Sequence, residues 1–392
     1  MIQTNKILLI TNYRPDKQFS MIKFGELMLS SINEFTNLEV QEIFPKSIFT
    51  KIFKQKKFKK IASYIDKYLL FPLFLKNHFE NSDKQFDLIH IVDHSNSIYF
   101  PELKKISSAT RMLTCHDLIA IRTALKEFPE APTTSCTGSF LQSKIKESLT
   151  TTDYFICDST QTLNDLNRLV PKSNSCSEVI HLGTQLRNGL PQINVNSNFD
   201  FESMNFILHV GSAAWYKNRR LLFNSFRYVC NSLYYQNLSL VLVGPSPQEN
   251  ELDEELSQWM EINKSKITVL NCISEDYLSR LYRNAIALVF PSYIEGFGWP
   301  PLEAAIHGCR VITTPTGAIK DILGENALYI NAKEQNSLNS AIINCLKSES
   351  SKKPAVFIPT NKDCIQKYQE VYQRLILCRR EKNRIKEKNA FA

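Results

Sequence analysis

A single stretch of the sequence, residues 285–316, sets the strongest limit on how this chain can fold. It opens with an apolar run of strand length, 285–290, which a proline and a serine then end. Residues 295–298 read E-G-F-G, and the two glycines allow the backbone to bend and to approach a ligand. Two prolines follow, at positions that the first turn of a helix tolerates, and 310–313 reads as the next strand. This order of strand, glycine-rich loop, helix and strand is typical of a parallel α/β sheet.

The chemistry of this loop predicts a ligand that carries both phosphate and hydroxyl groups. Free N–H groups at a helix N-terminus favour a phosphate. Glu295 in the loop and Glu303, expected in the first turn of the following helix, can accept hydrogen bonds from sugar hydroxyls. Together these features indicate a sugar nucleotide. The alternative is that Glu303 only favours the helix dipole and that the glycines only make a turn.

Composition narrows the class of protein further. A length of 392 residues suggests two domains, and 43% hydrophobic with 22% charged residues is typical of a soluble globular chain. The net charge of +8 fits an anionic ligand or an anionic membrane surface and does not by itself indicate nucleic acid. The ten cysteines show no CxxC pair and no zinc-type spacing. We therefore expect reduced thiols in a cytoplasmic protein without a secretory signal.

The motif E-G-F-G-x-P-x-x-E, residues 295–303, resembles the paired-glutamate signature of glycosyltransferase family 4. The resemblance implies an α/β fold of two doubly wound Rossmann-like domains that face a central cleft, the GT-B architecture. It also implies retaining transfer of a hexose, such as mannose or glucose, from a nucleotide diphosphate sugar to an acceptor hydroxyl. Polysaccharide or glycolipid assembly is the expected setting, with no cofactor and no metal.

The resemblance and the chain composition together predict four regions. We expect an acceptor-side domain over residues 1–186 and an Asn-rich linker over 187–203. A donor-binding domain should follow over 204–361. The last region, 362–392, is expected to form a helix that crosses back to the first domain and then a charged tail.

In the first domain, polar residues follow two apolar runs that read as strands. His94 follows one run, and His116 and Asp117 follow the next. Because ligands bind outside the carboxyl ends of strands in open α/β sheets, these residues are candidates for the site. His116 resembles the family's histidine near the transferred sugar, which makes it a predicted catalytic residue, although a purely structural histidine is the alternative.

In the second domain, an apolar run ends at Gly211, and Lys217 matches the lysine with which the family grips the donor diphosphate. Ser212 stands where the family often has an arginine, and Arg219, Arg220 or backbone N–H groups are expected to compensate. The predicted catalytic residues are His116, Lys217 and Glu295. The predicted donor-binding residues are Gly211, Ser212, Lys217, Asn218, Ile273, Gly296, Phe297, Gly298 and Glu303.

Residues 46–77 mix lysines with apolar residues at roughly helical spacing. This pattern predicts a basic amphipathic helix that contacts an anionic membrane, which would place the protein peripherally at the inner face. The alternative is a solvated basic face over the core.

The predicted partners are a nucleotide-sugar donor and a saccharide or lipid-linked acceptor, with no nucleic acid. Two other functions remain compatible with the sequence. One is a sugar-nucleotide epimerase of the same architecture, and the other is a non-catalytic donor-binding subunit of a glycosylation complex.

Overall fold

The computed structural model describes residues 5–16, 18–35, 38–53, 55–80, 86–183, 204–232, 234–271, 273–348 and 358–390. These residues form two compact units. The first comprises the described residues within 1–127, 134–183 and 359–392, and the second those within 128–133 and 184–358. The predicted linker, 187–203, lies outside the described residues.

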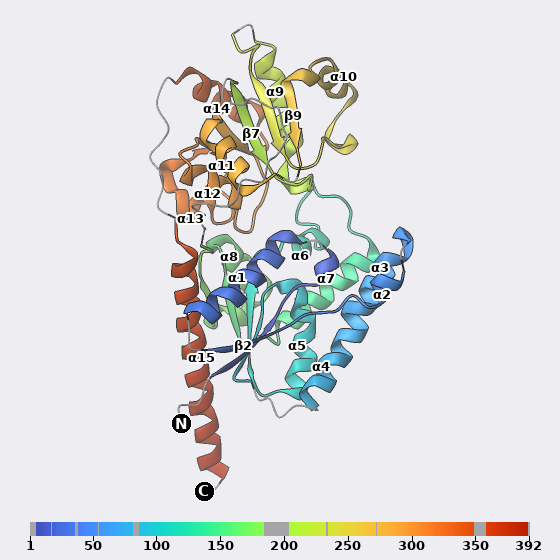
Figure 1. The fold of residues 1–392 in the computed structure, drawn as a ribbon, viewed down its shortest axis with the longest axis vertical. Helices are drawn as coiled ribbons and strands as arrows, with labels where there is room; N and C mark the ends of the chain where they lie inside the picture. The colour runs from blue at the N-terminus through green and yellow to red at the C-terminus, as the bar shows by residue number, and fades with distance from the viewer. Residues whose placement is uncertain are drawn as a thin grey trace. The chain divides into compact units, whose positions relative to one another are not determined.

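The first unit is a parallel sheet covered by helices (Figure 1). Its strands pair in the order β2-β1-β3-β4-β5-β6. They are β1 (Lys6–Ile10), β2 (Glu39–Ile43), β3 (Leu88–Ile91), β4 (Thr110–Cys115), β5 (Tyr154–Cys157) and β6 (Ser177–Val179). The helices are α1 (Phe19–Phe35), α2 (Phe49–Ile52), α3 (Lys56–Ile65), α4 (Phe71–Glu80), α5 (Phe100–Ile106), α6 (Ile119–Ala124), α7 (Cys136–Leu149), α8 (Thr160–Leu169) and α15 (Asn361–Ala390).

The second unit repeats the plan, with the strand order β12-β11-β10-β7-β8-β9, again parallel. Its strands are β7 (Phe206–Val210), β8 (Ser239–Val243), β9 (Ile267–Leu270), β10 (Ala287–Phe290), β11 (Val311–Thr313) and β12 (Leu328–Tyr329). Its helices are α9 (Arg219–Cys230), α10 (Glu254–Ile262), α11 (Glu275–Asn284), α12 (Trp299–Ile306), α13 (Ile319–Leu323) and α14 (Gln335–Lys347). The predicted fold class is confirmed, since both units are parallel sheets with helices.

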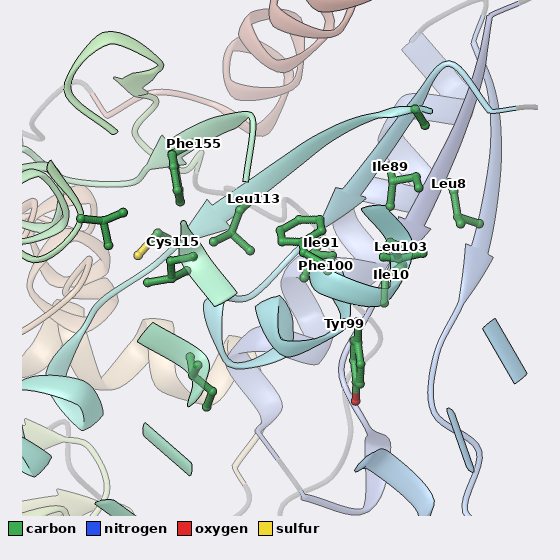
Figure 2. Packing of buried hydrophobic residues seen from close by; sticks show 14 of the residues in the cluster. Leu8, Ile10, Ile89, Ile91, Tyr99, Phe100, Leu103, Leu113, Cys115 and Phe155 are labelled. Carbon is green, nitrogen blue, oxygen red and sulfur yellow. The ribbon is translucent and has the colours of Figure 1, made fainter. Parts of the chain in front are cut away.

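Buried apolar strands explain why both sheets form. All four residues of β3 and all four of β10 are buried, as expected for strands that have helices on both faces. In the first unit Ile89, Ile91 and Leu113 belong to one buried cluster with Phe100 from α5 (Figure 2). These contacts hold the strands in the register that brings their carboxyl ends to one edge.

The C-terminal helix α15 packs on the first unit through an aromatic pair. Tyr368 and Tyr372, one helical turn apart, are fully buried. The hydroxyl of Tyr372 lies 2.7 Å from His90 Nδ1, and Thr114 Oγ1 lies 2.8 Å from His90 Nε2 and 3.0 Å from the Tyr368 hydroxyl. Burial lowers the pKa of His90 to about 3, so this ring is neutral. The helix continues to Ala390, so the predicted charged tail is helical for most of its length.

Candidate active site

Lys217 stands on a short turn, Trp215–Lys217, that follows β7. The next residue, Asn218, adopts a left-handed conformation with φ 52°, which asparagine tolerates better than most residues. Its side-chain amide donates to Pro291 O at 3.1 Å and to Ala332 O at 2.9 Å. The Asn218 amide therefore holds the turn against two loops, one after β10 and one after β12.

The Lys217 ammonium lies against the Glu295 carboxylate. Its Nζ is 2.8 Å from Oε1 and 3.1 Å from Oε2, and it also lies 4.7 Å from the centre of the Phe290 ring. Lys217 comes from the loop after β7 and Glu295 from the loop after β10, and these two strands are neighbours in the sheet. The structure thus brings together the residue predicted to bind phosphate and the residue predicted to bind sugar hydroxyls.

The E-G-F-G loop is supported from behind by the loop after β11. The Glu295 N–H donates to Thr316 Oγ1 at 3.1 Å, and the Ala318 N–H donates to Phe297 O at 3.1 Å. Gly317 has φ 62°, and a Cβ there would lie 2.7 Å from Gly296 O, so only glycine allows this approach. Phe297 is buried and its ring lies 4.8 Å from that of Trp299.

Glu303 occupies a different position from the predicted one. Helix α12 begins at Trp299 after Gly298, which has φ 90°, and no acidic residue lies in its first turn. Glu303 is therefore in the second turn, too far along for a strong interaction with the N-terminal dipole. Instead its Oε2 accepts a hydrogen bond of 3.0 Å from the hydroxyl of Tyr282, a buried residue of α11. This contact orients the Glu303 carboxylate.

The N-terminus of α12 has fewer free donors than a typical anion-binding helix. Pro300 and Pro301 lie in its first turn and have no N–H group. Two of the four N–H groups that a helix start normally offers are missing for this reason. The positive charge for a phosphate must then come mainly from a side chain, and Lys217 is the predicted one.

The predicted substitutes for the missing arginine point elsewhere. Ser212 is exposed, and its Oγ accepts a bond of 3.4 Å from the Ala214 N–H. Arg219 is buried, donates to Pro245 O at 2.9 Å and lies 3.1 Å from a Glu251 oxygen. Arg220 is exposed and pairs with Asp253 at 2.9 Å. Neither arginine therefore joins the Lys217–Glu295 pair in this structure.

Gly211 and Ile273 complete the predicted donor-binding set. The Gly211 N–H donates to Val243 O at 3.0 Å, which continues the pairing of β7 with β8. A Cβ on Gly211 would lie 3.8 Å from the Lys217 side chain, which places this glycine beside the lysine. Ile273 is half-buried and directly precedes Ser274, which caps α11.

In the first unit, His116 is held by two hydrogen bonds after β4. Its Nδ1 lies 2.9 Å from Asp158 Oδ2 and its Nε2 lies 2.9 Å from Val92 O. Because a carbonyl only accepts, Nε2 must carry a hydrogen. Burial opposes the charged ring, but the Asp158 carboxylate outweighs this effect and raises the pKa of His116. A direct bond from this ring to a sugar requires one of these partners to be displaced.

A second polar cluster at the same edge was not predicted as a whole. Asp93 accepts bonds from the Ser95 N–H at 3.0 Å and from the Asn12 amide, and the His94 ring lies 3.2 Å away. Burial would raise the pKa of Asp93, but His94 and the N–H donors hold it well below the usual range. Asp117 accepts from the N–H of Ile119, the first residue of α6, at 2.9 Å. Asn12 and Asp93 each follow an apolar strand, which is the signal that could have identified them.

Comparison with solved structures identifies the fold. The sucrose-phosphate synthase from Thermosynechococcus elongatus superposes with a TM-score of 0.67 at 18% sequence identity, covering 99% of this chain and 100% of that one. The fold is that of the GT-B glycosyltransferases. In addition, residues 193–364 match the model of the family described as "Glycosyl transferases group 1". The matched segment contains Lys217, Glu295 and Glu303.

Curated relatives are similar over part of their length. The O-antigen chain mannosyltransferase RfbU of Salmonella typhimurium is 33% identical over 149 residues, which are 36% of this chain and 39% of that protein. The serotype-specific mannosyltransferase WbdA of Escherichia coli is 32% identical over 108 residues, 27% of this chain and 13% of that protein. The chain therefore spans well under half the length of these relatives.

The described residues contain neither a membrane-spanning helix nor a metal-binding cluster. No described helix is both long and apolar enough to cross a bilayer. Among the same residues, no group of three or more His, Cys, Asp or Glu side chains is arranged to hold a metal ion.

Proposed function

We propose that this protein is a retaining glycosyltransferase that moves a hexose from a nucleotide diphosphate sugar to an acceptor hydroxyl. The observation that carries the proposal is the contact between Lys217 and Glu295 within a GT-B fold. A nucleotide sugar presents phosphate oxygens and sugar hydroxyls a few bonds apart, so neighbouring cationic and anionic side chains suit it. The two relatives named as mannosyltransferases favour a mannosyl donor and surface polysaccharide as the product.

In this proposal Lys217 stabilises the negative charge that develops on the leaving diphosphate. The lysine is already held by Glu295 and by the Phe290 ring, so little reorganisation is needed when charge appears. We propose that this cation and nearby N–H groups make a metal ion unnecessary. A chelator should accordingly leave the transfer rate unchanged.

Glu295 and Glu303 would recognise the two sugars of the donor. Glu295 would accept hydrogen bonds from hydroxyls of the transferred hexose, and Glu303 would accept them from the ribose. Tyr282 would keep the Glu303 carboxylate in the required orientation through its hydrogen bond of 3.0 Å. His116 is proposed to contact the transferred sugar, with Asp158 favouring the protonated form of its ring.

Turnover with identified products tests the proposal. The protein is incubated with GDP-mannose, UDP-glucose or UDP-galactose and an O-antigen oligosaccharide, and the product is examined by NMR. We expect release of nucleoside diphosphate together with a new glycosidic bond of the same anomeric configuration as the donor. Inverted configuration would contradict the retaining mechanism. Conversion of the donor to its epimer without an acceptor would indicate an epimerase, and binding without turnover would indicate a donor-binding subunit.

A further inference from the structure

The charge of this chain is concentrated in one segment, residues 46–77, which we call the lysine-rich arm. The arm contains nine lysines and a single acidic residue, Asp66, so its formal charge is +8. The whole chain also carries +8, and the remainder of the sequence is therefore balanced. Because the surplus of positive charge lies in one segment, it would attract an anionic partner to that segment rather than to the whole surface.

Apolar side chains are exposed on the same arm. Nine of the seventeen large apolar or aromatic side chains that are exposed among the described residues lie there, although the arm is under a tenth of the chain. They are Ile48, Ile52, Phe53, Phe58, Ile61, Tyr64, Leu69, Leu73 and Phe74. A monomeric soluble protein rarely exposes such a group of side chains without a binding partner.

The arm presents these side chains from an almost continuous helical run. Helix α3, a π-helical segment Asp66–Leu70 and α4 follow one another without a break, and Figure 1 shows α2, α3 and α4 along one flank of the first unit. Exposed apolar residues recur every three to five positions at Phe58, Ile61, Tyr64, Leu69 and Leu73. The interval of five residues, from Tyr64 to Leu69, includes the π-helical segment. A π-helix has about one residue more per turn than an α-helix, so the exposed apolar side chains stay on one face.

Polar and core contacts hold the opposite side of the arm in place. Asp66 is buried and accepts bonds from the Tyr13 hydroxyl at 2.7 Å and the Phe49 N–H at 2.9 Å. Lys67 pairs with Asp16 at 2.6 Å, and Phe71 and Leu75 belong to the core of the first unit. The exposed apolar side chains therefore belong to helices that are fixed to the first unit.

The anchor points lie next to the candidate site of the first unit. Tyr13 and Asp16 lie in the loop after β1, close in sequence to Asn12, whose amide donates to Asp93 at the carboxyl edge of the sheet. His116 lies at the same edge, after β4. A surface bound by the arm is consequently brought close to the edge where an acceptor would be held.

We propose that the lysine-rich arm docks on an anionic lipid membrane. Apolar side chains such as Phe58 and Ile61 enter the boundary between head groups and acyl chains, while Lys59 and Lys60 contact lipid phosphates. A second copy of this chain is a poorer occupant, because two arms of charge +8 repel each other.

Vesicle sedimentation tests the docking. The full chain is mixed with vesicles of phosphatidylcholine alone or of phosphatidylcholine with phosphatidylglycerol. We expect binding to the anionic vesicles only, weakened by added salt. Lys59→Glu with Lys60→Glu should weaken it by at least about twenty-fold, since each lysine near the surface contributes roughly five-fold. Ile61→Ser with Leu73→Ser should also abolish sedimentation.

Matched controls use exposed residues elsewhere. Lys264→Glu with Lys320→Glu makes the same change of charge outside the arm, and Ile262→Ser with Leu377→Ser removes two apolar side chains that are at least as exposed. They should sediment as the wild type does. Equal sedimentation of arm and control variants would overturn the proposal, as would a wild type that stays in the supernatant. Loss of a dimer in the arm variants, seen by analytical ultracentrifugation, would instead assign the face to a second copy.

The same samples separate this proposal from the proposed function. Each variant is also titrated with the donor that supports turnover, and thermal stability is followed. The arm variants should bind the donor as the wild type does, because their substitutions lie in the first unit and the Lys217–Glu295 site in the second. Donor binding without vesicle binding would overturn the membrane proposal alone.

Discussion

Lys217→Ala is expected to lower the transfer rate, kcat/KM, by about 10²–10³-fold, the loss typical of removing one preorganised electrostatic group. The reason is the shortage of other positive groups at this position. Ser212 replaces an expected arginine, Arg219 is paired with Glu251, and two prolines remove N–H donors from the start of α12. Steady-state kinetics with the identified donor measure the effect.

Arg220→Ala is the matched control for this prediction. Arg220 is a cation only three residues away, but it is exposed and pairs with Asp253. Its loss should change kcat/KM less than about three-fold, since exposed ion pairs contribute little. If both variants behaved alike, or if Lys217→Ala retained the wild-type rate with an unchanged thermal unfolding temperature, the assignment of Lys217 to the diphosphate would be wrong.

Glu295→Gln is expected to slow sugar transfer without weakening the binding of the nucleoside diphosphate. We predict that kcat falls by about 10²-fold, because a neutral amide holds the hydroxyls of the transferred sugar less strongly in the transition state. Affinity for the nucleoside diphosphate alone should be equal to or higher than that of the wild type. This product lacks the sugar, and Lys217 is released from its ion pair of 2.8 Å to contact phosphate. Calorimetric titration and initial rates give the two values.

The control for Glu295 is Glu325→Gln, which removes an exposed carboxylate of the same unit and should leave both values unchanged. A double variant, Lys217→Ala with Glu295→Gln, should lose little more than the stronger single variant, because the two residues act as one unit. Fully additive losses would show that the 2.8 Å contact between them has no functional consequence.

Apolar strands and glycine positions made much of the fold predictable. The central strands β1, β3, β7 and β10 are buried runs, and such runs are recognisable without an alignment. Strand β2 was not predicted, because its sequence EVQEI contains two glutamates and lies at the edge of the sheet. Edge strands need only one apolar face, so their pattern is weaker.

The sequence indicated several residues of the candidate site but not how they are arranged. The E-G-F-G motif indicated Glu295, but its contact with Lys217 depends on two strands that are neighbours in space and far apart in sequence. The position of Glu303 was predicted one turn too early, since the helix starts at Trp299 rather than at the prolines. Tyr282 and Thr316 were missed because no local pattern marks a residue that orients a side chain from another element.

The most direct test of the central claim is a donor titration of the second unit's site within the full chain. Wild type, Lys217→Ala and Glu303→Ala are titrated with GDP-, UDP- and ADP-sugars while thermal unfolding is followed. A ligand that binds only the native state must raise the unfolding temperature. We predict that one donor stabilises the wild type and that both variants lose this shift. Well-folded wild-type protein that no donor stabilises, or variants that respond as the wild type does, would contradict the claim that this site binds a nucleotide sugar.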